Sequence, residues 1–287
     1  MKKTHLMMID PQNDFCNKGD QKLYDVLKAA RIPDNEMPPD VKPGALFVAG
    51  ADQDMVRLAA FITRNQKRIT NITCTLDSHD PIHIAHPAFW RNSQGQNPAP
   101  FTLITAQDVK NGVWAAFSPQ LQARAQAYVD ALATNKRYVL VIWPPHCLIG
   151  SWGAGVVPAV HAAMSAWATA RFTRVNWVTK GSNYLTEHYS AVMADVPDPQ
   201  DISTKLNTDF LGAFVDADEI IITGEALSHC VANTVTDLAN NFGDDNIKKL
   251  VLLEDTTSNV TGFEKMGTDF VMAMVKRGMR LAKTTDY

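Results

Sequence analysis

The sequence predicts a single α/β domain in which a parallel β-sheet is covered by helices on both faces. Short apolar segments rich in β-branched residues alternate with segments that show the apolar spacing of helices. A helix between two strands makes a right-handed crossover, and repeated crossovers build a parallel sheet between two helix layers. No repeat, low-complexity segment or long linker divides the chain, so we expect one domain over residues 1–287 that carries insertions.

The N-terminal third contains two predicted strands separated by helices. Residues 5–10 form a short apolar run that ends in the turn-rich sequence Asp-Pro-Gln-Asn-Asp. A charged segment near 22–30 has helical character and precedes a proline cluster at 38–43. Residues 52–67 place apolar side chains at helical spacing after an aspartate near the helix start. The β-rich residues 68–76 then form the second strand.

The middle of the chain continues this alternation after an irregular stretch. Residues 91–117 show no strong periodicity and are interpreted as an excursion from the domain. The alanine-rich residues 119–134 predict a helix, and the apolar residues 137–142 predict a further strand. Residues 156–171 predict the next helix, and residues 175–179 predict the strand that follows it.

The C-terminal part adds two strands and two helices. The apolar residues 220–223 and 250–253 predict the strands, while residues 231–241 and 268–276 predict the helices. In sheets of this class, reactive groups collect where the carboxyl ends of the strands open into a crevice. The residues that follow each strand are therefore the candidates for a reactive site.

The composition indicates a soluble globular protein whose partner is neither nucleic acid nor a membrane. Hydrophobic residues make up 46% of the chain and charged residues 20%. The formal net charge is −3, with no run of like charge. No apolar run reaches the roughly 18 residues of a membrane span, and the N-terminus reads as a strand rather than a secretory signal. Four cysteines do not make a disulfide scaffold, so we expect a reducing compartment, most simply the cytoplasm.

Cys230 is the candidate nucleophile. It follows the strand 220–223 and the turn residue Gly224, at the predicted start of a helix. The helix dipole and the unpaired backbone N–H groups there favour a thiolate, which is the reactive form of cysteine. The adjacent His229 is a poor partner because neighbouring helical residues point about 100° apart, so we expect it to line the rim or cap the turn. The alternative is a buried cysteine that acts only as a small apolar residue.

Three further strand ends carry groups that can serve this cysteine. Asp10, Asp77 and Lys180 lie at or just after the carboxyl ends of predicted strands. An ammonium group beside a thiol lowers the pKa of the thiol, and a carboxylate can carry the proton away. Asp10 and Lys180 are therefore the predicted base and cation for Cys230. Taken singly, each would be an ordinary turn residue, and their convergence is what supports the prediction.

A histidine-rich loop after the second strand indicates a metal site. Asp77 and His79 are two residues apart in an extended segment and share one face, so they can chelate one ion. His83 follows four residues later with His86 close by, and His146 lies in Trp-Pro-Pro-His-Cys, which two prolines stiffen. A carboxylate with two or three imidazoles suits zinc, iron(II) or manganese. The alternative is a histidine-rich surface loop that binds nothing.

These segments together resemble the nicotinamidase branch of the isochorismatase-like cysteine hydrolases. They occur in the order of that family and span nearly the whole chain. The matching segments are MMIDPQNDFC (7–16), TLDSHDPIH (75–83), WPPHCLIGS (143–151), VTKGSNYLTEHYSAV (178–192) and ITGEALSHCVANTV (222–235). The combination of WPPHC with an upstream Asp-x-His and a downstream Lys-Gly is specific, whereas each motif alone would be a weak signal.

The resemblance implies a Rossmann-like three-layer fold and a cysteine-dependent hydrolase. It implies a catalytic triad of Asp10, Lys180 and Cys230. It also implies an oxyanion hole formed by the backbone amides of Ala226 and Cys230, with a cis peptide bond between Glu225 and Ala226.

The resemblance further implies one divalent transition metal, with zinc as the first choice and iron or manganese as alternatives. The implied ligands are Asp77, His79 and His146, with His83 as a candidate fourth ligand. The implied substrate pocket is aromatic and is lined by Phe15, Trp143 and Tyr189.

The implied reaction is the hydrolysis of nicotinamide to nicotinate and ammonia through a thioester. The alternatives are a related cysteine amidase for another small amide or carbamoyl compound, and a member of the fold that binds without catalysis. The chain departs from the common family pattern at Glu225, Leu227, Ser228 and His229 and carries insertions at about 17–46 and 92–136. These insertions could cover the pocket or form a homo-oligomer contact, and they leave the substrate more open than the reaction.

Overall fold

The computed structural model describes residues 2–135 and 138–287 of the chain. A six-stranded parallel sheet forms the centre of this described part, with the strand order β10-β9-β8-β1-β2-β7. The strands are β1 (Thr4–Ile9), β2 (Ile69–Asp77), β7 (Asn176–Lys180), β8 (Glu219–Gly224), β9 (Leu250–Leu253) and β10 (Arg280–Ala282). The predicted fold class, a parallel α/β sheet, is confirmed.

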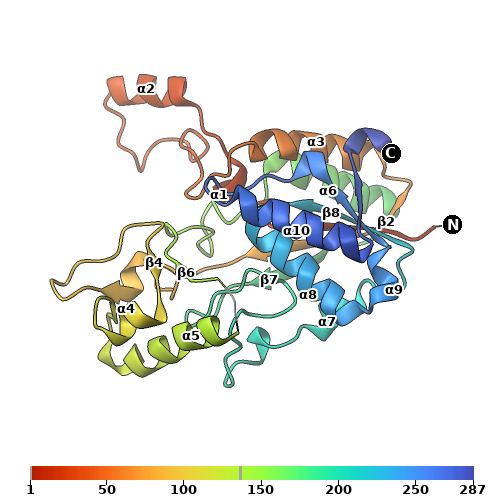
Figure 1. Ribbon diagram of the computed structural model, residues 1–287. Helices are drawn as coiled ribbons and strands as arrows, with labels where there is room; N and C mark the ends of the chain where they lie inside the picture. The colour runs from red at the N-terminus through yellow and green to blue at the C-terminus, as the bar shows by residue number, and fades with distance from the viewer. Residues whose placement is uncertain (1, 136–137) are drawn as a thin grey trace.

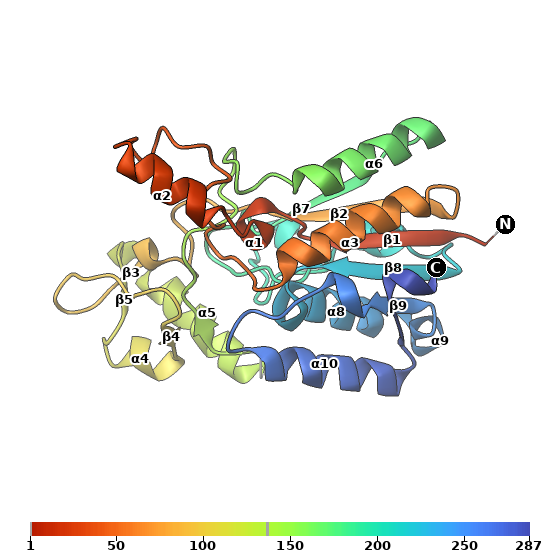
Figure 2. The ribbon, with the colours of Figure 1, turned by 90° about the horizontal axis from the view of Figure 1, so that it is seen from above.

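Helices cover both faces of this sheet (Figures 1 and 2). α3 (Ala51–Arg64) and α6 (Pro158–Arg171) pack against each other on one face. α8 (Ala232–Phe242) and α10 (Glu264–Arg277) lie on the opposite face. The chain runs outward from β1 in both directions along the sheet, so right-handed crossovers place the two pairs of helices on opposite faces. β1 and β8 are buried along their whole length, which explains why their sequences are continuous apolar runs.

The remaining elements lie mostly in the connections. The short helices are α1 (Asn13–Cys16), α2 (Gln21–Ala29), α4 (Ala106–Lys110), α7 (Thr208–Gly212) and α9 (Asp244–Ile247). α5 (Gln122–Thr134) is longer and packs against α4. Figure 2 shows α2 and the α4–α5 group beyond the carboxyl ends of the strands. The two predicted insertions therefore stand at the end of the sheet where a reactive site is expected.

The prediction that residues 137–142 form a strand of the main sheet is wrong. Residue 137 lies outside the described residues, and only β6 (Leu140–Val141) is extended. It pairs antiparallel with β4 (Leu103–Ile104) in a separate two-stranded sheet, and β3 (Trp90–Arg91) pairs likewise with β5 (Ala115–Ala116). An apolar run predicts burial but not the partner strand, and Leu140, Val141 and Ile142 are buried against residues 101–104 rather than beside β2.

Candidate active site

The carboxyl ends of four strands meet at one place. Asp10 directly follows β1, and Asp77 and Lys180 are the last residues of β2 and β7, where they are paired in register. Cys230 lies in a turn of π-helix, Leu227–Val231, that follows β8. All four side chains are buried. The structure therefore brings together the four strand-end residues that the sequence singled out.

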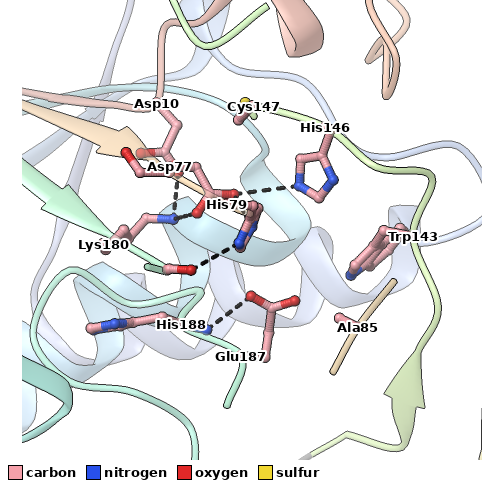
Figure 3. Close-up of polar contacts among 12 residues, drawn as sticks. Asp10, Asp77, His79, Ala85, Trp143, His146, Cys147, Lys180, Glu187 and His188 are labelled. Carbon is pink, nitrogen blue, oxygen red and sulfur yellow. Dashed lines mark hydrogen bonds and ion pairs between the residues drawn. The ribbon is translucent and has the colours of Figure 1, made fainter. Parts of the chain in front are cut away.

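Lys180 connects the other three groups. Its Nζ lies 2.8 Å from Asp10 Oδ2, 3.2 Å from Asp77 Oδ1 and 3.5 Å from Cys230 Sγ. Figure 3 shows the ammonium group between the two carboxylates. Burial alone would lower the pKa of Lys180, but Asp10 and Asp77 hold it well above its usual value, so the ammonium stays charged.

Asp10 is a carboxyl group suited to exchange a proton. Burial raises its pKa above the ordinary value, and Lys180 opposes that shift. Thr75 Oγ1 donates to Asp10 Oδ1 at 2.5 Å and accepts from the Asp10 amide at 3.1 Å, which holds the side chain toward the cysteine.

The resting state of Cys230 differs from the sequence prediction. Burial raises the pKa of its thiol well above the usual value, although Lys180 acts in the opposite direction. The helix start therefore does not produce a resting thiolate, because the loss of water outweighs it. The thiolate must form by transfer of the proton to a neighbouring base.

The turn before Cys230 depends on Gly224. This residue has a φ of 112°, and a Cβ atom there would lie 1.9 Å from the carbonyl oxygen of Ile9. The peptide bond between Glu225 and Ala226 is cis, as the resemblance implies. Across residues 2–135 and 138–287, no backbone acceptor takes the Ala226 N–H, so this amide is available beside Cys230.

Three imidazoles meet next to Asp77. Ligand atoms of His79, His86 and His146 lie within 4.8 Å of one another, and all three residues are buried. The Nε2 atoms of His79 and His146 lie 3.0 and 3.4 Å from Asp77 Oδ2. Figure 3 shows both rings turned toward this carboxylate. The set has the donor types and the spacing of a transition-metal site.

Backbone carbonyls fix the orientation of these rings. The Nδ1 atoms of His79, His86 and His146 lie 3.0, 3.4 and 2.9 Å from the carbonyl oxygens of Gly181, Pro81 and Pro144. Each Nδ1–H can therefore donate outward, which leaves each Nε2 lone pair for a shared centre. Within the described chain, His86 Nε2 is buried without a hydrogen-bond partner, as expected for an atom that binds a cation.

His83 does not reach this centre. Its Nδ1 accepts from the Ala85 amide at 3.2 Å, and its Nε2 lies 3.2 Å from the carbonyl oxygen of Thr186. Both ring nitrogens are thus used by the backbone, and burial lowers the pKa of the ring well below its usual value. The geometry puts His86 in the place that the sequence prediction offered to His83.

An aromatic cluster stands beside Cys230. Its members are Trp143, Tyr189, His229 and Phe263. The ring of His229 lies 5.2 Å from Trp143, 5.3 Å from Tyr189 and 4.8 Å from Phe263, between ring centroids. Trp143 Nε1 donates to the Tyr189 hydroxyl at 2.7 Å. Phe15, the third predicted pocket residue, packs instead against the ring of His146, with 5.3 Å between the ring centroids.

His229 is buried in this cluster rather than placed at a rim. Val260 N–H donates to Ser228 Oγ at 3.1 Å, and Ser228 Oγ lies 2.9 Å from His229 Nδ1. Burial lowers the pKa of His229 to about 4, so the ring is neutral at pH 7. A hydroxyl group can both donate and accept, so this contact fits either tautomer; in the tautomer that accepts from Ser228, the ring offers one Nε2–H donor to the aromatic cluster.

Sequence reasoning did not identify two side chains at this site. Phe263 is brought to the cluster by the loop before α10. Glu187 is buried with Oε1 accepting from the His188 amide at 2.9 Å, and its Oε2 has no partner in the part of the chain described. Neither residue follows a local pattern. Glu225, which the sequence marked as a departure from the family pattern, is completely buried beside Ala226.

A cavity of about 790 Å³ lies elsewhere, between α6 and β7. It is lined by His161, Met164, Trp177 and neighbouring residues, and none of the groups above contributes to it. The functional assignment therefore rests on the convergence of reactive groups and not on the size of a cavity.

Comparisons with known proteins identify the fold. No protein-family model and no curated protein matches the chain. Among solved structures, an Acinetobacter baumanii nicotinamidase/pyrazinamidase is similar over 100% of this chain and 98% of its own, with a TM-score of 0.60 and 19% identity. The yeast nicotinamidase bound to the inhibitor nicotinaldehyde is similar over 98% of this chain and 99% of its own, with a TM-score of 0.60 and 17% identity. A Pyrococcus horikoshii pyrazinamidase in complex with zinc is similar over 98% of this chain and 99% of its own, with a TM-score of 0.52 and 15% identity. The fold expected from the sequence resemblance is thereby shown.

Proposed function

We propose that this chain is a metal-containing cysteine amidohydrolase and that it hydrolyses nicotinamide to nicotinate and ammonia. The observation that carries the proposal is the direct contact of the Lys180 ammonium with Asp10 and Cys230. A protein that only binds has no need of a buried acid, cation and thiol in mutual contact, because burying such groups costs several kcal/mol per ion. The shared fold with solved nicotinamidases supports the choice of substrate.

The acylation step uses the three groups in contact. Asp10 accepts the proton of Cys230 Sγ, and Lys180 stabilises the negative charge that passes between them. The thiolate then attacks the amide carbonyl carbon and forms the C–S bond, while the carbonyl electron pair moves to oxygen. The backbone N–H groups of Ala226 and Cys230 stabilise this oxyanion, at about 3 kcal/mol for each donor.

The protonated Asp10 completes the cycle. It gives its proton to the departing amine, so that ammonia leaves and a thioester of Cys230 remains. A water molecule then attacks the thioester with Asp10 as its base, which releases the carboxylic acid and restores the thiol. The raised pKa of Asp10 suits a group that must both accept and return a proton.

The imidazole centre fits a divalent cation. Asp77, His79, His86 and His146 would hold zinc, iron or manganese, since three Nε2 lone pairs face one carboxylate there. A bound ion would act as a Lewis acid that orients the substrate, for instance through a pyridine nitrogen. Zinc is the first choice because imidazole and carboxylate are its usual ligands.

The principal test is ammonia release from nicotinamide by the purified, metal-loaded protein. Wild-type protein is expected to release ammonia, and Cys230→Ala is expected to lose at least about 10³-fold in kcat. A matched control is Cys74→Ala, which removes another buried cysteine, in β2, whose thiol donates to the carbonyl oxygen of Thr75. No release from wild-type protein would reject nicotinamide as the substrate.

A second candidate substrate class is favoured by His229. In the tautomer that accepts from Ser228, its Nε2–H is a hydrogen-bond donor inside the aromatic cluster, and a pyridine carboxamide whose ring nitrogen binds elsewhere offers this donor no additional acceptor. A small aromatic or carbamoyl compound with an additional acceptor would satisfy this donor. A panel of small amides, scored by kcat/KM, distinguishes the two candidates. The four free cysteines fit a reducing compartment such as the cytoplasm for either.

A further inference from the structure

Glu225 is a buried carboxyl group that the proposed mechanism does not use. Its side chain is completely buried, and it directly precedes Ala226, whose amide is assigned to the oxyanion hole. Glutamate is almost never fully buried unless a partner holds it. The position therefore calls for a physical explanation in the contacts of the Glu225 carboxyl.

Ser258 binds both ends of the segment 225–227, which is named here the oxyanion turn. Its backbone N–H donates to Glu225 Oε2 at 2.9 Å, and its carbonyl oxygen accepts from the Leu227 amide at 2.8 Å. Ala226 lies between the two residues that Ser258 binds. The direction of the Ala226 N–H thus depends on a ring of hydrogen bonds that includes the Glu225 side chain.

Helix α3 supports this ring through Asp54. Ser258 Oγ donates to Asp54 Oδ2 at 2.5 Å, and Arg57 Nη2 donates to Asp54 Oδ1 at 2.6 Å. The other oxygen of Glu225, Oε1, is buried without a hydrogen-bond partner among the described residues, and Asp54 is the acidic group whose charge acts on this carboxyl. Figure 2 shows α3 crossing the face of the sheet next to β8, so this support comes from the helix layer behind the site.

The two carboxyl groups share one cation. Arg57 contacts Asp54 directly, and Asp54 also accepts from Ser258, so Asp54 carries the negative charge. The other ionisable groups that face Glu225 are Cys16 of α1, whose thiol is neutral, and the more distant Arg57. Burial and the Asp54 charge raise the pKa of Glu225 well above its usual value, so Glu225 keeps its proton.

We propose that Glu225 is a positioning residue that acts through Ser258 to aim the Ala226 N–H at the oxyanion. This inference rests on the proposed function, since it concerns the same reaction. Loss of the Glu225 proton at alkaline pH would place two negative charges beside one Arg57 and open the ring. A leucine at this position would leave the part-buried Ser258 N–H without its acceptor, which is the more costly way to lose a hydrogen bond.

The variants Glu225→Gln and Glu225→Leu separate positioning from simple packing. Glu225→Gln keeps an acceptor for the Ser258 N–H and, like the protonated acid, carries no charge, so kcat is expected within about threefold of wild type at pH 7. Glu225→Leu is expected to lower kcat about 10- to 100-fold with little change in KM, because the oxyanion develops in the transition state and is absent from the bound substrate. The matched control is Asp52→Asn, which removes a partly exposed charge of α3 outside the ring.

The pH profile gives a readout that a purely structural role would not change. Wild-type kcat is expected to fall at alkaline pH as Glu225 loses its proton. Glu225→Gln has no such proton, so this fall is expected to move to higher pH or disappear. An alkaline fall in Glu225→Gln identical to that of wild type overturns the role of the proton.

An aldehyde probe tests the oxyanion turn without turnover. The thiol of Cys230 adds to pyridine-3-carbaldehyde, forming a C–S bond while the carbonyl oxygen takes the electron pair and the proton. Glu225→Leu is expected to weaken the adduct at least 10-fold and Glu225→Gln less than threefold. Equal affinities in all three proteins, or no adduct on wild type, overturn the inference. An adduct series of the expected order in a wild-type protein that hydrolyses no amide rejects the proposed function alone and supports the positioning role.

Discussion

His86→Ala and His83→Ala should affect different properties of the protein. The two histidines lie three residues apart and both are buried, yet only His86 has a free Nε2 at the imidazole centre. His83 has both ring nitrogens bound to backbone groups. We therefore expect His86→Ala to impair metal binding and His83→Ala to impair stability.

The magnitudes follow from these contacts. Four-ligand zinc sites bind with about 10 to 16 kcal/mol, so one of four ligands contributes roughly 3 kcal/mol, and His86→Ala should raise the Kd for zinc about 100-fold or more. His83→Ala leaves the Ala85 amide and the Thr186 carbonyl oxygen unpaired in the interior, at about 1 to 3 kcal/mol for each unsatisfied group. The apo form of His86→Ala should lose much less stability, since its Nε2 has no protein partner.

The assays are a zinc affinity measured by competition with a chromophoric chelator and the urea unfolding of the metal-free proteins. His161→Ala, an exposed histidine of α6, is the control and should change neither. Loss of zinc affinity in His83→Ala with wild-type affinity in His86→Ala would refute the ligand assignment.

Three further predictions concern residues around the site and the sheet. Gly224→Ala should destabilise the fold by roughly 2 to 5 kcal/mol in urea unfolding, because the new Cβ would clash with the Ile9 carbonyl oxygen and because residue 224 has a φ of 112°. Wild-type stability of this variant would contradict the close approach. Ser228→Ala should lower kcat/KM about 5-fold, since the His229 tautomer loses its donor at about 1 kcal/mol; an unchanged kcat/KM would remove the tautomer argument. Burial lowers the folded-state pKa of His5 to about 4, below the 6.5 of the unfolded chain, so the stability that depends on a neutral His5 is present above pH 6.5 and is lost as pH falls toward 4. Between pH 7 and pH 5, this loss should lower the free energy of unfolding of wild type by about 2 kcal/mol more than that of His5→Gln. An equal decrease in both proteins would count against a neutral His5.

The reactive groups could be predicted from the sequence because their placement is a property of topology. Asp10, Asp77 and Lys180 end strands of one parallel sheet, and the carboxyl ends of parallel strands meet at one edge whatever the details of packing. The same rule placed Cys230 after β8. Its protonation could not be predicted this way, since the thiol pKa depends on how completely the neighbours exclude water.

The strand predicted at 137–142 failed for a related reason. Its apolar pattern predicts a buried segment, and Leu140, Val141 and Ile142 are buried, whereas Val139 is exposed. Whether such a segment pairs with β2 or with β4 depends on residues far away in the chain, and β7 occupies the edge beside β2. Local pattern carries no information about that competition.

The sequence by itself determined the sheet class, the strand-end acid, cation and thiol, and the histidine-rich loop, because these follow from local apolar patterns and one topological rule. Only the tertiary structure decided that His86 and not His83 faces the imidazole centre, since the carbonyl that engages His83 lies 103 residues away. It also decided the support of the oxyanion turn, where Ser258 joins Asp54 across 204 residues of sequence. Such hydrogen bonds are set by how distant segments pack, and the local sequence around each residue does not specify them.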